Sequence, residues 1–274
     1  MKIEKGKITT KFISIIRATM LIWGIVLLQA CQNSTQENSL QQQDQEHPNI
    51  TKLKSQNAEF IPEIIKLNEK VYVAVGYDGS NASMVVGEKG VVIIDALRAL
   101  GAAEKVAEEF RNITDKPVEA LIYTHGHLDH TGGTSAFVGN NKDVKIIARE
   151  GFKDELQEHS PVEPILKQRN IRQFGRDLPA KEIINRGVAP GTTPTDRAGK
   201  GYLPPNLTFQ DSITLNLAGI DIELHAADGE TNDELFVWIP DSKTLFTGDN
   251  YYKSFPNLYA IRGSQYRDVK SWGE

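Results

Sequence analysis

The sequence predicts an α/β protein in which strands and helices are arranged in layers, and three observations lead to this fold class. Apolar runs of strand length recur in two β-rich stretches, one amphipathic helix lies within the first stretch, and a cluster of histidines follows a buried strand. The predicted strands cover residues 70–76, 82–87, 91–95, 118–123 and 145–148 in the first stretch, and 213–217, 220–224, 235–239 and 244–247 in the second.

The connections between these strands differ in character. A turn rich in glycine and aspartate separates the first two strands, and residues 97–110 have apolar side chains at helical spacing with Lys and Glu opposite. Residues 149–205 are polar and contain several glycines and prolines, so we expect long loops around short helices there. A last helix begins at Val269 and the chain then ends, so we expect the fold to be C-terminally truncated.

The N-terminus has the features of an export signal. A basic stretch through Arg17 precedes an apolar run, residues 18–28, that is too short to cross a bilayer comfortably. Residues 28–31 then have the sequence LQAC, which resembles a bacterial lipobox. We therefore predict a lipoprotein signal peptide at residues 1–30, lipidation of Cys31, and a protein that is exported and lipid-anchored to the bacterial envelope, facing the periplasm. An ordinary signal peptide followed by an incidental cysteine is the alternative.

The composition of the chain beyond this signal is also informative. Residues 31–58 consist largely of Gln, Asn, Ser and Glu, which predicts a disordered tether before a catalytic domain at residues 59–274. Without the first thirty residues the chain has 26 basic and 35 acidic side chains, a net charge of −9. Such a chain has no electrostatic reason to bind nucleic acid or an anionic membrane, so we expect membrane contact through the lipid anchor only.

The strongest chemical pattern lies at the end of the strand at residues 118–123. Residues 124–133 have the sequence THGHLDHTGG and contain three of the six histidines, His125, His127 and His130, together with Asp129. Neutral imidazole and carboxylate are the ligands that zinc accepts, and the alternating spacing presents two of the imidazoles to one ion. A solvated histidine cluster that binds metal only adventitiously is the alternative.

This motif resembles the signature of the metallo-β-lactamase superfamily, and the order of elements is similar from about residue 70 to residue 246. The resemblance implies a four-layer αβ/βα sandwich with two zinc ions at its edge. It also implies a ligand in residues 227–235, ADGETNDEL, where Glu230 stands in place of the usual histidine and Glu234 is a rival candidate. The strand at residues 244–247 is followed by Asp249, whose carboxylate is expected to bridge the two ions.

The predicted metal ligands are therefore His125, His127, Asp129, His130, Glu230 and Asp249. We assign His125, His127 and Glu230 to one ion, and the other three residues to the second, with Asp249 shared. Asp129 is also the predicted catalytic residue.

Within the superfamily, the sequence resembles the linear alkylsulfatases. The similarity lies in residues 71–78, 92–97 and 120–133, in the glutamate at position 230, and in residues 258–268, LYAIRGSQYRD. In that family the first arginine of the last stretch binds sulfate, which assigns substrate binding to Arg262. The predicted reaction is zinc-dependent hydrolysis of an alkyl sulfate ester to alcohol and sulfate by a metal-bound hydroxide.

Two alternatives remain: another hydrolase of the superfamily, acting on a lactone, thioester or β-lactam, and an inactive metal-binding fragment. The second arises because the superfamily has one further histidine ligand downstream, whereas no histidine follows His225. The resemblance also implies a homodimer in a full-length form of the protein.

Overall fold

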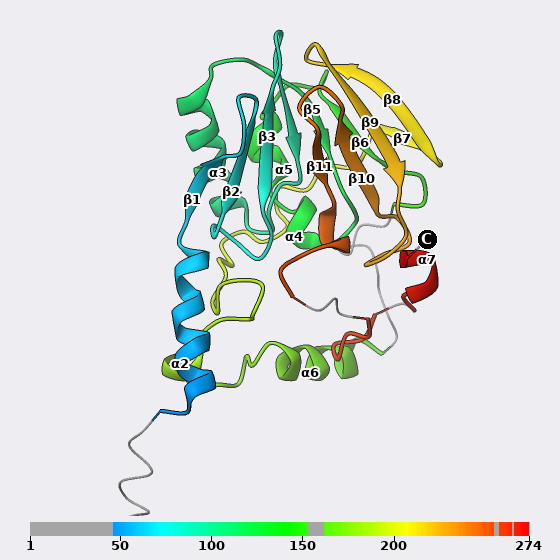
Figure 1. Cartoon of the computed structure of the whole chain (residues 1–274). Helices are drawn as coiled ribbons and strands as arrows, with labels where there is room; N and C mark the ends of the chain where they lie inside the picture. The colour runs from blue at the N-terminus through cyan, green and yellow to red at the C-terminus, as the bar shows by residue number, and fades with distance from the viewer. Residues whose placement is uncertain (1–45, 153–161, 255–257, 265, 274) are drawn as a thin grey trace, which may run out of the picture. The chain divides into compact units, whose positions relative to one another are not determined.

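The computed structural model describes residues 46–152, 162–254, 258–264 and 266–273 (Figure 1). The chain divides into two compact units, Met1–Lys52 and Leu53–Glu274, and the second contains the sheets and the predicted site. Within the described ranges, no helix has both the length and the apolar character needed to cross a membrane. The predicted signal peptide, Cys31 and most of the predicted tether lie outside these ranges.

The described end of the predicted tether is helical. Helix α2 spans Pro48–Ser55 and the 3-10 helix η1 spans Gln56–Phe60, so the prediction of disorder is wrong for residues 48–58. Neither helix has a buried residue, which is why an apolar pattern gave no sign of them. Proline is also well tolerated in the first turn of a helix, where α2 begins.

A seven-stranded sheet forms the centre of the second unit, and its strands lie side by side in chain order. Pairing is antiparallel from β1 to β4 and parallel from β4 to β7. The strands are β1 (Glu63–Lys66), β2 (Val71–Val75), β3 (Ala82–Val86), β4 (Val91–Ile94), β5 (Val118–Ile122), β6 (Lys145–Arg149) and β7 (Leu207–Phe209).

A second sheet has four antiparallel strands in the order β11-β10-β9-β8. Its strands are β8 (Ser212–Leu217), β9 (Ile220–Ala226), β10 (Leu235–Ile239) and β11 (Thr244–Phe246). Alternate residues of β10, Leu235, Val237 and Ile239, are fully buried, as expected for a sheet with one face on the core. They pack with apolar side chains of the first sheet, such as Val92 and Ile122, in a core between the two sheets.

Helices cover the other face of the first sheet. A second apolar core joins α3 (Leu100–Ile113) and α5 (Thr134–Val138) to that sheet. The remaining helices are α4 (Leu128–Thr131), α6 (Glu163–Gln173), η3 (Ala180–Glu182), η4 (Gly248–Asn250) and α7 (Val269–Gly273). The predicted α/β sandwich of the metallo-β-lactamase type is confirmed, and the described residues form three of its four layers, one of helices and two of strands.

The predicted strands all occur, within about two residues of their predicted ends. The short strands β1 and β7 were not predicted. Helix α3 begins at Leu100 rather than at Leu97, because Leu97 has a left-handed backbone with φ of 61°. The buried Asp78 carboxylate accepts the backbone N–H groups of Arg98 and Ala99 at 3.2 and 2.8 Å, and so fixes the segment that leads into the helix.

Candidate metal centre

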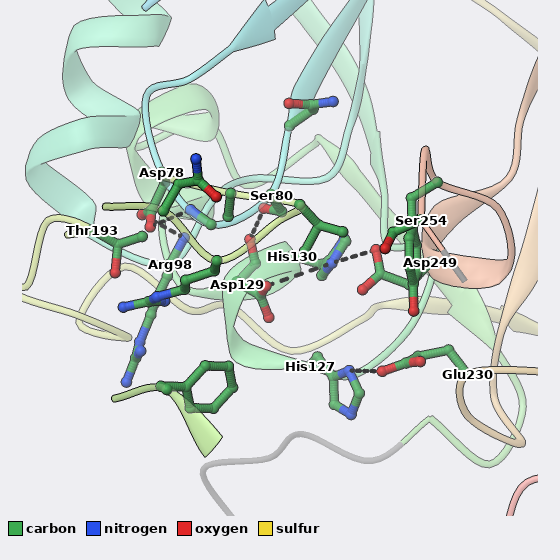
Figure 2. A pocket seen from close by; sticks show the side chains of 18 of the residues that line it. Asp78, Ser80, Arg98, His127, Asp129, His130, Thr193, Glu230, Asp249 and Ser254 are labelled. Atoms are coloured by element: carbon green, nitrogen blue, oxygen red, sulfur yellow. Dashed lines mark hydrogen bonds and ion pairs between the residues drawn. The ribbon is translucent and has the colours of Figure 1, made fainter. Parts of the chain in front are cut away.

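Four chain segments bring the predicted ligands together at one edge of the sandwich (Figure 2). The loop after β5 and helix α4 carry the histidine motif, the turn before β10 carries Glu230, and η4 after β11 carries Asp249. Each segment directly follows or precedes a buried strand, so the two sheets fix the positions of the ligands.

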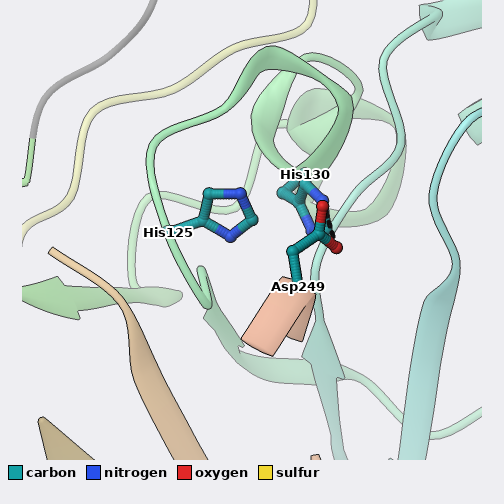
Figure 3. Close-up of side chains that lie close together, drawn as sticks. All are labelled: His125, His130 and Asp249. Atoms are coloured by element: carbon teal, nitrogen blue, oxygen red, sulfur yellow. Dashed lines mark ion pairs between the residues drawn. The ribbon is translucent and has the colours of Figure 1, made fainter. Parts of the chain in front are cut away.

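The first group of potential ligands consists of His125, His130 and Asp249, one ligand atom of each lying within 4.8 Å of the others (Figure 3). Both imidazoles are buried, and the Asp249 side chain is 34% exposed. His130 Nε2 lies 3.3 Å from Asp249 Oδ1.

The second group consists of His127, Glu230 and Asp249, again within 4.8 Å. His127 Nδ1 lies 3.7 Å from Glu230 Oε1. Asp249 belongs to both groups, as expected for a carboxylate that bridges two ions.

This grouping differs from the predicted one in the place of His125. The sequence assigned His125 to one ion with His127 and Glu230, whereas the structure groups it with His130, whose ring centroid lies 4.2 Å away. His125 Nε2 also lies 2.9 Å from His127 Nδ1, so His125 stands between the two groups. Asp129 Oδ2 lies 3.9 Å from His130 Nε2, and all six predicted ligands therefore form one continuous cluster.

The donor set fits a divalent metal ion. His130 Nε2 is buried without a hydrogen-bond partner while it faces the Asp249 carboxylate. A buried polar atom of this kind needs an explanation, and an ion between imidazole and carboxylate supplies one. Imidazole and carboxylate together suit zinc, although they also accept other divalent ions.

Asp95, at the end of β4, orients His130. His130 Nδ1–H donates to Asp95 Oδ2 at 2.8 Å, which leaves Nε2 as the nitrogen available to a metal. The same carboxylate accepts the backbone N–H and the hydroxyl of Thr124, at 2.8 and 2.9 Å. Asp95 has a left-handed backbone with φ of 58°, a conformation that aspartate tolerates better than most residues. Asp95 stands at the end of an apolar strand, and neither its residue type nor its position in the sequence marked it as a site residue.

Glu234, the rival candidate for Glu230, has a different position. It is fully buried and its Oε1 accepts the backbone N–H groups of Asp249 and Asn250, at 2.7 and 3.2 Å. Gly248 makes this contact possible, because a Cβ there would lie 2.5 Å from Glu234 Oε1. Glu234 thus holds η4 in place, and Glu230 is the glutamate in the ligand groups.

Two arginines contact the cluster. Arg267, which is 3% exposed, places Nη2 and Nη1 each 2.5 Å from one oxygen of Glu230. Arg262, the predicted sulfate-binding residue, lies with Nη2 3.4 Å from His127 Nε2. Arg267 was missed as a site residue, although it stands in the same stretch of sequence as Arg262.

Burial and charge perturb these groups strongly. Burial and the nearby Asp249 raise the pKa of Glu230 to about 7, against the opposing effect of Arg267 and Arg262. Burial lowers the pKa of His125 well below its ordinary value. Burial opposes charge on His130 as well, but Asp95, Asp249 and Asp129 outweigh it and raise the pKa of His130. Burial also opposes charge on Asp249, yet the positive His130 holds the pKa of Asp249 well below its ordinary value. Perturbations of this size are typical of functional sites.

The other histidines lie elsewhere. His225 is exposed and pairs with Glu223 at 3.1 Å, and His47 is exposed before α2. His159 is outside the described residues.

A cavity of about 1180 Å³ opens onto the cluster. His127, Asp129, Glu230 and Asp249 line it together with Arg262. A small organic molecule can therefore reach the ligands and the arginine from the same side.

Comparisons with known proteins agree with this geometry. The model of the "Metallo-beta-lactamase superfamily" matches residues 75–254. The chain is similar to a linear primary-alkylsulfatase of Pseudomonas sp. (strain ATCC 19151), with 32% identity over 196 residues that cover 69% of this chain and 37% of that protein. It is 28% identical to an (R)-specific secondary-alkylsulfatase of Pseudomonas sp., over 76% of this chain and 33% of that protein.

Among solved structures, the stereoselective inverting sec-alkylsulfatase Pisa1 of Pseudomonas sp. matches with a TM-score of 0.65 and 25% identity, over 77% of this chain and 35% of that chain. The chain thus spans about a third of the length of the relatives that it matches. The family match contains the histidine motif, Glu230 and Asp249, and the chain belongs to the metallo-beta-lactamase superfamily.

Proposed function

We propose that this chain hydrolyses alkyl sulfate esters to an alcohol and inorganic sulfate in a zinc-dependent reaction. One observation carries the proposal: Arg262, a residue suited to sulfate, contacts His127 of the ligand cluster and faces the same cavity. A guanidinium group donates two parallel hydrogen bonds to a tetrahedral oxyanion, which lysine cannot do.

The chain offers two groups of potential metal ligands for this reaction. His125, His130 and Asp249 would hold one ion, and His127, Glu230 and Asp249 the other. When bound, zinc supplies Lewis acidity and activates water at neutral pH.

The other residues bind and orient. Arg262 would donate to the sulfate oxygens and stabilise the charge that develops as the ester bond breaks. Asp129, with 37% of its side chain exposed beside His130, holds a carboxylate where it can accept a hydrogen bond from the attacking water. Leu128, Ile183 and Ile184 give the cavity an apolar wall for an alkyl group.

The relatives support this choice within the superfamily, since those reported above are alkylsulfatases by name. They are much longer than this chain. Their activity therefore suggests which substrates to test and does not assign a substrate to this chain. For the location we propose export and a lipid anchor at Cys31, on the strength of the basic, apolar and LQAC segments in residues 1–31.

The test combines metal analysis with a substrate panel. The purified chain, supplied with zinc, should release sulfate from dodecyl sulfate faster than it opens a lactone, a thioester or a β-lactam. Arg262→Met should lower sulfate release while zinc content stays unchanged, and Arg197→Met, a matched change at an exposed ion pair away from the cavity, should leave both unchanged. Preference for any other substrate of the panel, or equal activity of Arg262→Met and wild type, would refute the proposal.

A further inference from the structure

Three arginines from separate segments meet on one wall of the cavity. Arg98 lies between β4 and α3, Arg176 follows α6, and Arg186 follows η3, and all three line the cavity. Arg98 and Arg186 are half-buried, whereas Arg176 is exposed at the surface. We call these residues the arginine wall.

The guanidinium groups of the arginine wall have no ion-pair partners among the described residues. Nε of Arg98 and Nε of Arg186 are buried without hydrogen-bond partners. Among the residues that the structure describes, no side-chain hydrogen bond or salt bridge is formed by any of the three guanidinium groups. Burial, and then the charge of the neighbouring arginines, lowers the pKa of both Arg176 and Arg186.

Two carboxylates near the arginine wall, Asp78 and Asp129, also interact with other groups. Asp78 and Asp129 both act electrostatically on Arg186. Asp78, however, already accepts three backbone N–H groups, from Gly79, Arg98 and Ala99, and Asp129 is a predicted metal ligand. These two carboxylates face three guanidinium groups, so the charge of the arginine wall exceeds that of its acidic neighbours.

The Phe174 ring contacts two of the guanidinium groups. The Arg176 and Arg186 guanidinium carbons lie over the Phe174 ring, 5.5 and 5.2 Å from its centroid. Cation–π contacts of this kind attract a cation to the ring. They hold two like charges close together without neutralising either of them.

Arg98 of the arginine wall lies across Asp129 from Glu230 and Asp249. Figure 2 shows Arg98 with Asp78 and Thr193 on one side of Asp129, and Glu230 and Asp249 on the other. A molecule whose sulfate is bound at Arg262 can therefore extend past Asp129 toward the arginine wall within the same cavity.

We propose that the arginine wall binds a second anionic group of the substrate, so that the preferred substrates are sulfate esters with a carboxylate or second sulfate at the far end of their organic group. This inference rests on the proposed function and narrows its substrate class. Its physical reason is that three guanidinium groups without ion-pair partners line the same cavity, and a bound anion accepts charge-assisted hydrogen bonds from their terminal nitrogens.

Binding can be tested without turnover. A series of ω-hydroxycarboxylates of increasing length, the alcohol products of such substrates, is titrated into the zinc-supplied chain by calorimetry. We expect Arg186→Gln to weaken the best binder by about 10- to 100-fold, the range for hydrogen bonds to charged groups. Arg172→Gln, which removes the same charge from an exposed residue of the same cavity, should leave binding unchanged.

Kinetics then test the substrate class. The ratio of kcat/KM for 11-carboxyundecyl sulfate to that for dodecyl sulfate should exceed one in the wild type and fall about tenfold or more in Arg186→Gln. Arg176→Gln is a second variant, because an exposed side chain can be replaced without loss of the fold.

The outcomes separate the two proposals. If hydroxycarboxylates bind through Arg186 but no sulfate is released, the arginine wall is supported and the sulfatase proposal fails. If sulfate is released but neither Arg186→Gln nor Arg176→Gln changes binding or the kcat/KM ratio, the arginine wall proposal is overturned. It is also overturned if inorganic sulfate alone occupies the site through Arg186 and the hydroxycarboxylates do not.

Discussion

Arg267→Leu is expected to destabilise the metal-free protein strongly. The Arg267 and Glu230 side chains are 2% and 8% exposed, and they are joined by two contacts of 2.5 Å. The substitution removes the partner charge but retains much of the volume, so Glu230 remains buried without its counter-ion. Breaking a buried pair in this way costs about 3–5 kcal/mol of the free energy of unfolding.

The free energy of unfolding that Arg267→Leu removes should depend on pH and be larger at high pH. The pKa of Glu230 is raised to about 7 from 4.5, so the folded state holds its proton longer than the unfolded state. The raised pKa of Glu230 therefore stabilises the folded state fully at pH values below the unfolded pKa of 4.5, and this stabilisation is lost as the pH rises through about 7. Without Arg267 the folded pKa rises further, and the cost of Arg267→Leu should be larger at about pH 9 than at about pH 5.

Urea denaturation in the presence of a chelator measures this cost at both pH values. Arg197→Leu is the matched control, because its pair with Glu104 has side chains 45% and 49% exposed. Solvent screens an exposed pair, so it is expected to contribute little to the free energy of unfolding. A loss for Arg267→Leu no greater than the control's, or a loss that is the same at both pH values, would contradict the assignment of this pair as a buried support of Glu230.

Three further predictions concern separate parts of the chain. Glu230→Ala should lower the zinc content of the folded protein much more than Glu234→Ala does, as measured by mass spectrometry, because Glu230 belongs to a ligand group whereas Glu234 holds η4; a larger loss of zinc for Glu234→Ala would exchange their roles. Asp95→Asn should weaken zinc binding about 10- to 100-fold in a competition assay, because it loosens His130, and unchanged affinity would remove Asp95 from the site. Cys31→Ser should abolish labelling of the protein in cells by a fatty-acid analogue, and labelling that persists would exclude this lipidation site.

The strands and the histidine motif could be predicted because each depends on local sequence. A buried strand needs a short apolar run, and a run such as residues 118–122 has few other uses. The motif then comes directly after that strand, so its ligands share one loop and one short helix. Glu230 and Asp249 required the family resemblance, because a turn glutamate and a Gly-Asp pair have ordinary structural uses as well.

Asp95, Arg267 and the grouping of His125 could not be predicted, because each depends on contacts between distant segments. The bond from His130 to Asp95 joins residues 35 positions apart, and that from Arg267 to Glu230 joins residues 37 positions apart. Helix α2 was missed for the opposite reason, since a helix with no buried face carries no apolar pattern to detect.

The residues predicted to hold the metal and the residues proposed to bind the substrate differ in where they lie in the fold. The ligands stand at the ends of strands, where two apolar cores determine their positions, and so the metal centre identifies the superfamily. Arg176 and Arg186 lie instead in the polar stretch between β6 and β7, where the described residues form loops interrupted by the short helices α6 and η3. Such a stretch can change its side chains without disturbing the sheets, so a motif that predicts the metal says little about the substrate. For this chain, the substrate panel tests the reacting group, and variation of the far end of the substrate tests the proposed role of the arginine wall.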